Sequence, residues 1–448
     1  MNTTIASPLP CPSRSARLRA FALAHIVLLL PLALSADYEK PYEYSVGNGE
    51  AIITGVDKPA MTGAVVIPET LGGYPVRGIA FNAFVHCDSL TAVTLPNSLR
   101  NIGEGAFLLC SSLAAVTIPN GVTNIHDGAF VFCESLADIT IPASVISIGE
   151  RVFYSCFSLT NITVAAGNPS FVDIDGVLCD INGTTLLQCP GGRSGAYTIP
   201  DSITTIGGGA FYSCASLTAV AIHKGVTSIT PFNFAAFSAC TSLTSIDVAA
   251  DNPNYASSGG VLFNKTLATL IHYPNGLHGA YTIPDGVTAI GDDAFRYSAF
   301  LTSVTIPGSV TSIGEGAFAD CPLLASVLFT GNAPTAVGND VFYDTPDATV
   351  YYLPGATGWG DTFAGRPVVP WDAAFSTAVP PQTTASGAFA FGLAGTEGIP
   401  VRIEACDDLA TRNWTILTNT TLSADGTLDF TDPGAATRPS RFYRIVFP

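Results

Sequence analysis

The stretch NIGEGAFLLCSSLAAVTIP, residues 101–119, decides the fold because its pattern returns along the chain. Within it, Phe107, Cys110 and Leu113 are spaced three residues apart. The same Phe-x-x-Cys-x-x-Leu spacing recurs at a step of 23 residues around Cys87, Cys110, Cys133 and Cys156, and further copies lie around Cys214, Cys240, Ser298, Cys321 and, in decayed form, after Phe342. A fixed period of about 20–30 residues with this many copies predicts a solenoid of stacked coils.

Each copy contains one short apolar strand. In LAAVTIP, residues 113–119, alternation directs Leu113, Val116 and Ile118 to the interior and Ala115 and Thr117 to the surface. Glycine-rich turns such as IGEG then reverse the chain. A single coil cannot bury its own apolar side, whereas stacked coils share a continuous core that the phenylalanines and cysteines fill.

Two steps of the repeat are 58 residues long instead of 23, from Cys156 to Cys214 and from Cys240 to Ser298. The extra residues form two similar inserts, at about 165–199 and 249–283, which both start near Asn-Pro and end in GAYTIP. Apolar runs on both sides of Asn182-Gly183 predict a β-hairpin in the first insert. The inserts are therefore interpreted as duplicated modules within a modular array.

Composition supports a β-rich protein. The 448 residues are 12% charged, with a net charge of -17, and include 43 Gly and 31 Pro. So many turn residues do not suit a helical bundle, and the chain is too apolar for disorder. The acidic balance argues against nucleic acid, whose phosphates need Lys and Arg, and against docking on anionic lipid.

The N-terminus carries a targeting signal. Arg14, Arg17 and Arg19 precede the apolar stretch 20–36, which ends in small residues. This order predicts a signal peptide, residues 1–36, with cleavage after Ser35 or Ala36, and no membrane span in the remaining chain. The alternative is an uncleaved anchor, for which the apolar stretch is short.

The repeat resembles the BspA-like class of bacterial surface-antigen leucine-rich repeats. FLTSVTIPGSVTSIGEGAFADC, residues 300–321, is close to the typical unit of that class, and VYYLPGATGWGDTFAGRPVVPW, residues 350–371, is similar to the way such arrays end. The resemblance covers roughly residues 45–371. It implies a right-handed solenoid with a parallel sheet on one face, secretion or surface display, and binding rather than catalysis.

The repeat ends before the C-terminus. Accordingly, the sequence predicts a leucine-rich-repeat solenoid at 37–371, a Pro/Thr/Ala-rich linker at 372–385 and a small antiparallel β-sandwich at 386–448. Trp414 and Tyr443 in the last module could stack on a sugar, but such aromatics are more often the core of a small sandwich.

The cysteine column is interpreted as packing. One cysteine per coil forms a line rather than the converging set of four that a zinc site needs. Cys179 and Cys189 lie outside the repeat motif, and Phe263 and Tyr273 replace them in the second insert. Because both positions change together, they are predicted to touch, as a disulfide in the first insert and an aromatic pair in the second; a free buried pair is the alternative.

No catalytic or metal site is predicted. The chain lacks a Gly-x-Ser-x-Gly elbow, and its histidines are assigned to surface or turn positions: His86, His126, His223, His272 and His278. Asp173 and Asp175 in VDIDG could suggest calcium, but the second insert has Ser257 and Gly259 there and two carboxylates supply too few ligands. The interpretation is a protein that is not an enzyme and has no cofactor.

The outward strand positions are the candidate ligand-binding face, since solenoids commonly bind along a sheet. They form two columns, which end at Ser326 and Leu328. The candidate residues are Ala92, Thr94, Ala115, Thr117, Asp138, Thr140, Asn161, Thr163, Ser245, Asp247, Ser303 and Thr305. The alternative interpretation is that a threonine ladder is simply good β-surface.

The sequence thus predicts a secreted or cell-surface bacterial protein that binds a protein or glycan partner in adhesion or recognition. Two other hypotheses stay open. One is a polysaccharide-binding accessory protein that acts through the C-terminal module, and the other is a structural envelope component. The identity of the ligand does not follow from the sequence.

Overall fold

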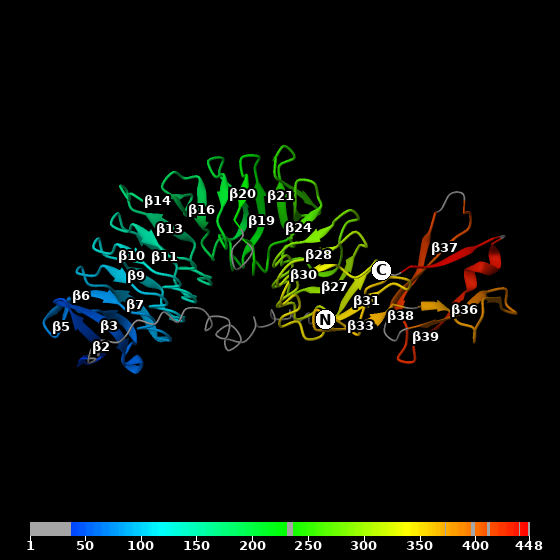
Figure 1. Ribbon diagram of the computed structural model, residues 1–448, viewed down its shortest axis with the longest axis horizontal. Coiled ribbons are helices and arrows are strands. Elements are labelled where there is room, and N and C mark those ends of the chain that lie inside the picture. The colour runs from blue at the N-terminus through cyan, green and yellow to red at the C-terminus, as the bar shows by residue number, and fades with distance from the viewer. Residues whose placement is uncertain are drawn as a thin grey trace, which may run out of the picture.

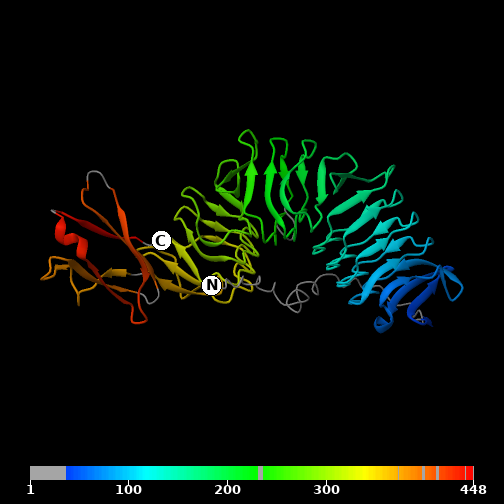
Figure 2. The same ribbon diagram turned by 180° about the vertical axis from the view of Figure 1, so that it is seen from behind.

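The computed structural model describes residues 37–230, 236–371, 373–395, 399–409, 413–438 and 440–446. The predicted signal peptide lies outside these residues. The described chain forms an arch of stacked β-coils, with a smaller group of antiparallel sheets at its C-terminal end (Figure 1). The view from behind shows the same order of coils along the arch (Figure 2). The predicted fold class, a solenoid followed by a small antiparallel β-structure, is confirmed.

Each ordinary coil contributes one strand to a long-strand face and one shorter strand, of two residues in most coils, to a short-strand face. Strands of successive coils pair in parallel on both faces. The long-strand face consists of β4 (Gly63–Val66), β7 (Leu90–Thr94), β9 (Ala115–Thr117), β11 (Asp138–Ile141), β13 (Asn161–Val164), β17 (Gly195–Thr198), β19 (Leu217–Ile222), β21 (Ser245–Val248), β25 (Gly279–Thr282), β27 (Leu301–Ile306), β29 (Ser326–Phe329), β31 (Thr349–Tyr352) and β33 (Arg366–Pro370). The short-strand face consists of β6 (Tyr74–Ile79), β8 (Asn101–Ile102), β10 (Asn124–Ile125), β12 (Ser147–Ile148), β18 (Thr205–Ile206), β20 (Ser228–Ile229), β26 (Ala289–Ile290), β28 (Ser312–Ile313) and β30 (Ala336–Val337).

The N-terminal end of the solenoid is closed by antiparallel strands. The elements there are β1 (Asp37–Glu39), β2 (Tyr42–Gly47), β3 (Glu50–Val56), the short helix η1 (Lys58–Ala60) and β5 (Thr70–Leu71). β3 pairs in parallel with β6, so a hairpin layer covers the first coil. Such a cap protects an end that would otherwise present a free sheet edge and apolar side chains.

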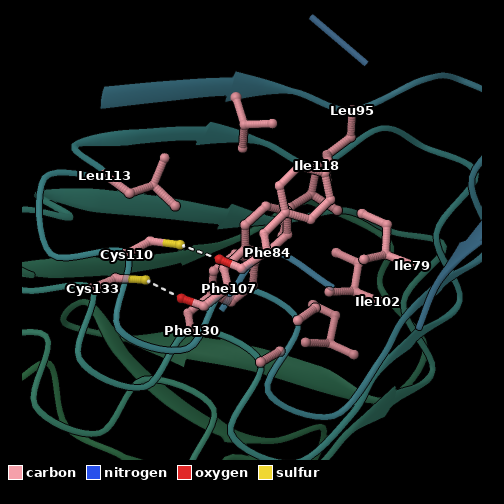
Figure 3. Close-up of a cluster of buried hydrophobic side chains, with 14 of the residues drawn as sticks. Ile79, Phe84, Leu95, Ile102, Phe107, Cys110, Leu113, Ile118, Phe130 and Cys133 are labelled. Atoms are coloured by element: carbon pink, nitrogen blue, oxygen red, sulfur yellow. Dashed lines mark hydrogen bonds between the residues drawn. The ribbon is translucent and has the colours of Figure 1, made fainter. Parts of the chain in front are cut away.

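A column of stacked phenylalanines fills the core. The ring centroids of Phe84 and Phe107 are 4.9 Å apart, those of Phe107 and Phe130 are 5.3 Å apart, and all three side chains are fully buried. The backbone holds this spacing, since the N–H of Phe107 donates to Ala129 O at 2.8 Å in the next coil. Figure 3 shows the phenylalanines side by side, with the cysteines of the same coils beside them. The predicted interior positions of Phe, Cys and Leu are confirmed.

The IGEG turn needs its two glycines for different reasons. A Cβ on Gly103 would lie 2.5 Å from Ile79 O of the preceding coil, so only glycine allows this close approach. Gly105 has a φ of +59°, a left-handed conformation that glycine adopts without strain. The turn is therefore tight because successive coils touch through their backbones.

The two inserts have the same strand pattern. The predicted hairpin around Asn182-Gly183 is confirmed, because β15 and β16 on either side of it pair antiparallel. The third strand of each insert rejoins the short-strand face, where β16 pairs in parallel with β18 and β24 with β26. The strands are β14 (Phe171–Ile174), β15 (Val177–Asp180) and β16 (Thr185–Gln188) in the first insert, and β22 (Tyr255–Ser258), β23 (Val261–Asn264) and β24 (Thr269–His272) in the second.

The inserts divide the long-strand face into three panels. The first panel comprises two sheets, β4-β7-β9 and β11-β13, the second is β17, β19 and β21, and the third is the continuous sheet from β25 to β33. The short-strand face breaks at the same places, so β12 and β20 are the last strands of their sheets. Each break leaves a sheet edge that an ordinary neighbouring coil would have covered.

The C-terminal sheets share a small apolar core that includes Phe391, Val401 and Ile403. Their elements are β34 (Ala373–Phe375), β35 (Gln382–Thr383), β36 (Phe389–Gly395), β37 (Pro400–Cys406), β38 (Thr415–Thr421), β39 (Thr427–Asp432), the short helix η2 (Pro433–Thr437) and β40 (Phe442–Val446), and the hairpin strand β32 (Thr362–Phe363) precedes them. β34 and β35 lie within 372–385 and pair with β36, so the segment predicted as a linker contributes strands to this sheet. The domain boundaries themselves stay predictions.

Candidate ligand-binding surface and the cysteine column

The first panel presents the predicted columns in register. Across β7 and β9, Ala92 lies opposite Ala115 and Thr94 opposite Thr117. The next two strands, β11 and β13, continue both columns with Asp138 opposite Asn161 and Thr140 opposite Thr163, and of these eight residues only Ala92 and Asn161 are half-buried while the others are exposed. The panel is therefore a strip of small and polar side chains that is open to a partner.

The columns end where each insert begins. Ile162 N–H donates to Gly176 O at 3.0 Å, and Ile246 N–H donates to Gly260 O at 2.8 Å. The hairpin turn of each insert thus takes the hydrogen bond that a further coil would have made. The remaining candidates lie on other panels: Ser245, whose hydroxyl donates to Asp247 at 2.7 Å, on the second, and the half-buried Ser303 and Thr305 on the third.

The expected exposure of Leu328 at the end of one column is wrong. Leu328 is only 3% exposed because it belongs to the apolar cluster of the C-terminal sheets, together with Trp371 and Phe391. Tyr351 on the next strand meets Trp371 at 5.6 Å between ring centroids. The C-terminal sheets therefore cover the last strands of the third panel, and the first panel is the larger open surface.

The column cysteines donate hydrogen bonds within the core. Cys110 Sγ lies 3.1 Å from Phe84 O, and Cys133 Sγ lies 3.3 Å from Phe107 O (Figure 3). Burial raises the pKa of Cys156 to about 12, so this thiol stays protonated at neutral pH and is a poor nucleophile and metal ligand. Among the described residues, no group of three or more His, Cys, Asp or Glu is placed to hold a metal ion.

The ninth coil shows that a hydroxyl can replace the thiol as the hydrogen-bond donor at this position. Phe342 stacks on Phe318 at 5.5 Å, as the decayed copy predicts. Three residues later stands Thr345, whose hydroxyl donates to Phe318 O at 2.7 Å. The hydroxyl thus replaces the thiol of the other coils.

The insert cysteines are both buried free thiols in the structure. Cys189 N–H donates to Ala210 O at 2.7 Å, the same bond that Tyr273 makes with Ala294 in the second insert. Tyr273 stacks on Phe295 at 5.0 Å and thereby extends the phenylalanine column. Since no ring contact between Phe263 and Tyr273 occurs in the described chain, the second copy does not support the predicted contact. A Cys179–Cys189 disulfide in the oxidised protein stays a prediction, which intact mass spectrometry without reductant decides.

The assignment of His272 to the surface is wrong. His272 is 1% exposed, lies against Phe237 at 5.8 Å, and neither ring nitrogen has a hydrogen-bond partner among the described residues. Burial lowers the pKa of His272 to about 3, so the ring is neutral. The other four histidines are exposed or half-buried. The sequence signal for this burial is the alignment of the two inserts, in which His272 is equivalent to Gln188, a residue that is also buried.

The acids of VDIDG have structural partners. Asp173 Oδ1 accepts the N–H of Val164 at 2.7 Å, and Asp175 forms an ion pair with Arg193. In the second insert, Ser257 Oγ accepts the N–H of Val248 at 3.0 Å in the same place as Asp173. A serine fills the role equally well, which favours a hydrogen-bonding function over metal binding at this position.

Tyr443 and Trp414 do not form one stacking site. Tyr443 packs on Phe389 at 4.8 Å in the core and donates to Asp432 at 2.9 Å. Arg444, the next residue on β40, lies 4.3 Å above the ring of Trp414. Since neighbouring side chains of a strand point to opposite faces, the two aromatic rings belong to opposite sides of the sheet.

A pocket of about 280 Å³ lies at the junction between the fourth coil and the first insert. Its wall on the coil side runs from Ile148 to Tyr154, Leu178, Leu187 and Gln188 come from the insert, and Gly207, Gly208 and Thr230 come from the coils after it. The repeat pattern gave no indication of this pocket.

The family model for the BspA type leucine rich repeat region matches residues 67–173, 196–278 and 274–357 in six copies, more than half of the chain. No curated protein matches the chain. Among solved structures, it is similar to a leucine rich cell surface protein from Faecalibacterium prausnitzii, with 25% identity over 75% of this chain and 94% of that one and a TM-score of 0.42. A leucine rich repeat protein from T. pallidum is 30% identical over 47% of this chain and 81% of that one, with a TM-score of 0.29.

The pneumococcal vaccine antigen PcpA is 20% identical over 71% of this chain and 81% of that one, with a TM-score of 0.39. None of the helices in the described residues has the length and apolarity to cross a membrane. The family model and the stacked parallel coils agree. The chain belongs to the BspA type leucine-rich repeat family.

Proposed function

We propose that the protein is secreted or displayed on a bacterial surface and binds a protein or glycan partner through the first panel, without catalysis. The observation that carries this proposal is the exposed strip formed by two in-register strand pairs, β7 with β9 and β11 with β13. Its outward side chains are small, so a partner can approach the sheet closely over several coils. Asp138 adds a negative charge, while Thr and Asn add hydrogen-bonding groups.

The other panels are less suited to this role. The third is covered at its end by the C-terminal sheets, and the second is bounded by both inserts. In contrast, the first panel lies on the longest run of 23-residue repeats, from the copy around Cys87 to the copy around Cys156. A surface built from many weak, repeated contacts gains area with each coil, which is how solenoids bind extended ligands.

The test uses the chain that begins at Asp37, probed on a glycan array and on an array of secreted proteins. The double variant Ala115→Arg/Thr117→Arg places two large cations in the centre of the strip and is expected to reduce binding at least tenfold. Thr311→Arg, at an exposed threonine on the short-strand side, is the matched control. Unchanged binding by the double variant, with an unchanged melting temperature, would rule out the first panel as the site.

A further inference from the structure

The loops that open the two inserts have the same backbone hydrogen bonds. The amide of Asn168 donates to Pro142 O at 2.8 Å and to Val145 O at 3.0 Å, and its oxygen accepts from two N–H groups of its own loop. Asn252 makes the same four bonds in the second insert. The two loops are therefore anchored in the same way on the coil before them.

Two side chains of these loops differ in the hydrogen bonds that they form with the preceding coil. In the second insert, Asn254 Nδ2 donates to Thr227 O at 2.6 Å, and Tyr255 Oη accepts the N–H of Ile229 at 2.8 Å. These bonds satisfy Thr227 O and the outward N–H of Ile229 at the edge of β20. In the first insert the same positions hold Ser170 and Phe171, which make no such bonds in the structure.

The outward hydrogen-bonding groups of β12 consequently have no partner among the described residues, and the ring of Phe171 packs against the core without offering one. The strand before it shows what such an edge normally receives: Thr123 O accepts from Ile146 N–H at 2.9 Å, and Ile125 O accepts from Gly149 N–H at 2.8 Å. On β12, no described residue bonds the equivalent oxygens of Ile146 and Ile148 or the outward N–H of Ile148. The side chain of Ile146 is 56% exposed beside them.

The open edge leads into the 280 Å³ pocket, which begins at Ile148. Its floor is apolar where Leu178 and Leu187 line it. Glu150, Arg151 and Tyr154 also line it on the coil side, and Gly207, Gly208 and Thr230 line it on the side of the following coils. The junction thus combines a strand edge with space for a side chain.

We propose that this junction binds an extended peptide segment of a partner protein, which adds a short parallel strand to β12. One peptide residue has both groups that the edge requires, since its N–H can donate to Ile146 O while its C=O accepts from Ile148 N–H. The residue two positions further donates to Ile148 O, and an aliphatic side chain enters the pocket over Leu178 and Leu187. Strand addition to an exposed edge is a general mode of peptide recognition.

The second junction identifies the chemistry. There the carboxamide N–H of Asn254, which resembles a peptide N–H, donates to Thr227 O. Two residues further along the coil, Tyr255 Oη accepts the N–H of Ile229. A peptide backbone offers the same pair at the spacing of a strand. The site is separate from the first panel, because it lies on the short-strand side of the coils.

The test exploits the difference between the inserts. The variant Ser170→Asn/Phe171→Tyr gives the first insert the closing groups of the second, and the reverse variant Asn254→Ser/Tyr255→Phe is the matched control. The chain beginning at Asp37 is applied to an array of hexapeptides of varied aliphatic and charged composition. We expect peptide capture by the wild type, at least a tenfold loss of affinity in Ser170→Asn/Phe171→Tyr, and no loss in the control.

Peptides with N-methyl groups at alternate residues provide a second measurement that does not depend on folding of the variant. Two peptides are compared, with methyl groups either on the N–H groups that face β12 or on those that face away from it. The first cannot donate to Ile146 O and is expected to lose binding at least tenfold, whereas the second should still bind. Equal binding of methylated peptides in both registers, equal affinity of the closed variant, or no peptide capture by the wild type would overturn the proposal. Capture of a glycan that the closed variant loses would assign the pocket to sugars instead.

Discussion

The two inserts have the same backbone course but differ in the side chains that pack in their cores. Asn168 and Asn252 anchor both loops with the same four hydrogen bonds, and Asp173 and Ser257 accept equivalent N–H groups. In the interior, by contrast, Cys179 and Cys189 stand where the second insert has Phe263 and Tyr273. The comparison indicates that hydrogen bonds set the course of the chain, while each core adapts its side chains separately.

The difference in side-chain volume gives the largest expected effect. Phe263 is fully buried in the second insert, and Phe263→Ala should reduce the free energy of unfolding by about 3–5 kcal/mol through lost burial and a cavity. Cys179→Ala at the equivalent position should cost about 1 kcal/mol, because the sulfur is the one heavy atom that is removed. Urea unfolding of both variants measures this, and equal costs would show that the two cores are not built differently.

The shared anchors should respond alike. Asn168→Ala and Asn252→Ala each leave two carbonyl oxygens and two N–H groups without partners in a buried loop, so we expect a loss of about 2–3 kcal/mol in both cases. The measurement is again the free energy of unfolding. A difference of more than about 1 kcal/mol between the two variants would contradict the equivalence of the loops.

His272 should make the second insert sensitive to acid. Its pKa of about 3 in the folded state lies below the unfolded value of about 6.5, so the unfolded chain binds the proton first as the pH falls. The contribution to stability is complete above pH 6.5 and decreases towards pH 3, by about 2 kcal/mol at pH 5.

His272→Gln copies Gln188 of the first insert and should remove this loss. The stability of wild type and variant is compared at pH 7 and pH 5. Burial raises the pKa of Asp293 to about 6, which has the opposite pH dependence, but this contribution is common to both proteins and cancels in the difference. Identical pH profiles for the two proteins would show that His272 is not buried in neutral form.

The smallest effects are expected in the cysteine column. Cys110→Ser keeps a donor for Phe84 O and should cost about 1 kcal/mol, as Ser298 and Thr345 occupy the same position elsewhere. Cys110→Val has nearly the same size but no donor and should cost about 2 kcal/mol. Thermal unfolding distinguishes them, and a Val variant as stable as the Ser variant would show that the thiol hydrogen bond contributes nothing.

The repeat positions were predictable because they are local. Phe107, Cys110 and Leu113 lie within seven residues, and their period fixes the stacking, the interior columns and the register of Thr94 with Thr117. The hairpin at Asn182-Gly183 was also readable, because its turn residues and apolar runs adjoin.

Other features depend on contacts that no local pattern encodes. Leu328 is buried by the C-terminal sheets, through partners such as Phe391 that lie far along the chain. His272 lies in an insert, where the ordinary repeat pattern does not apply, and its equivalent in the first insert is the buried Gln188. The difference between the junctions depends on Asn254 and Tyr255 reaching the strand of the preceding coil, about 26 residues earlier, which Ser170 and Phe171 do not bond.

Amide hydrogen exchange of the unliganded protein compares the two junctions directly. The outward N–H of Ile229 donates to Tyr255 Oη, whereas that of Ile148 has no described partner and stands at the edge of its sheet. If the first junction is open and the second closed, the amide of Ile148 exchanges at least tenfold faster than that of Ile229. Equal protection of the two amides would contradict the difference between the inserts.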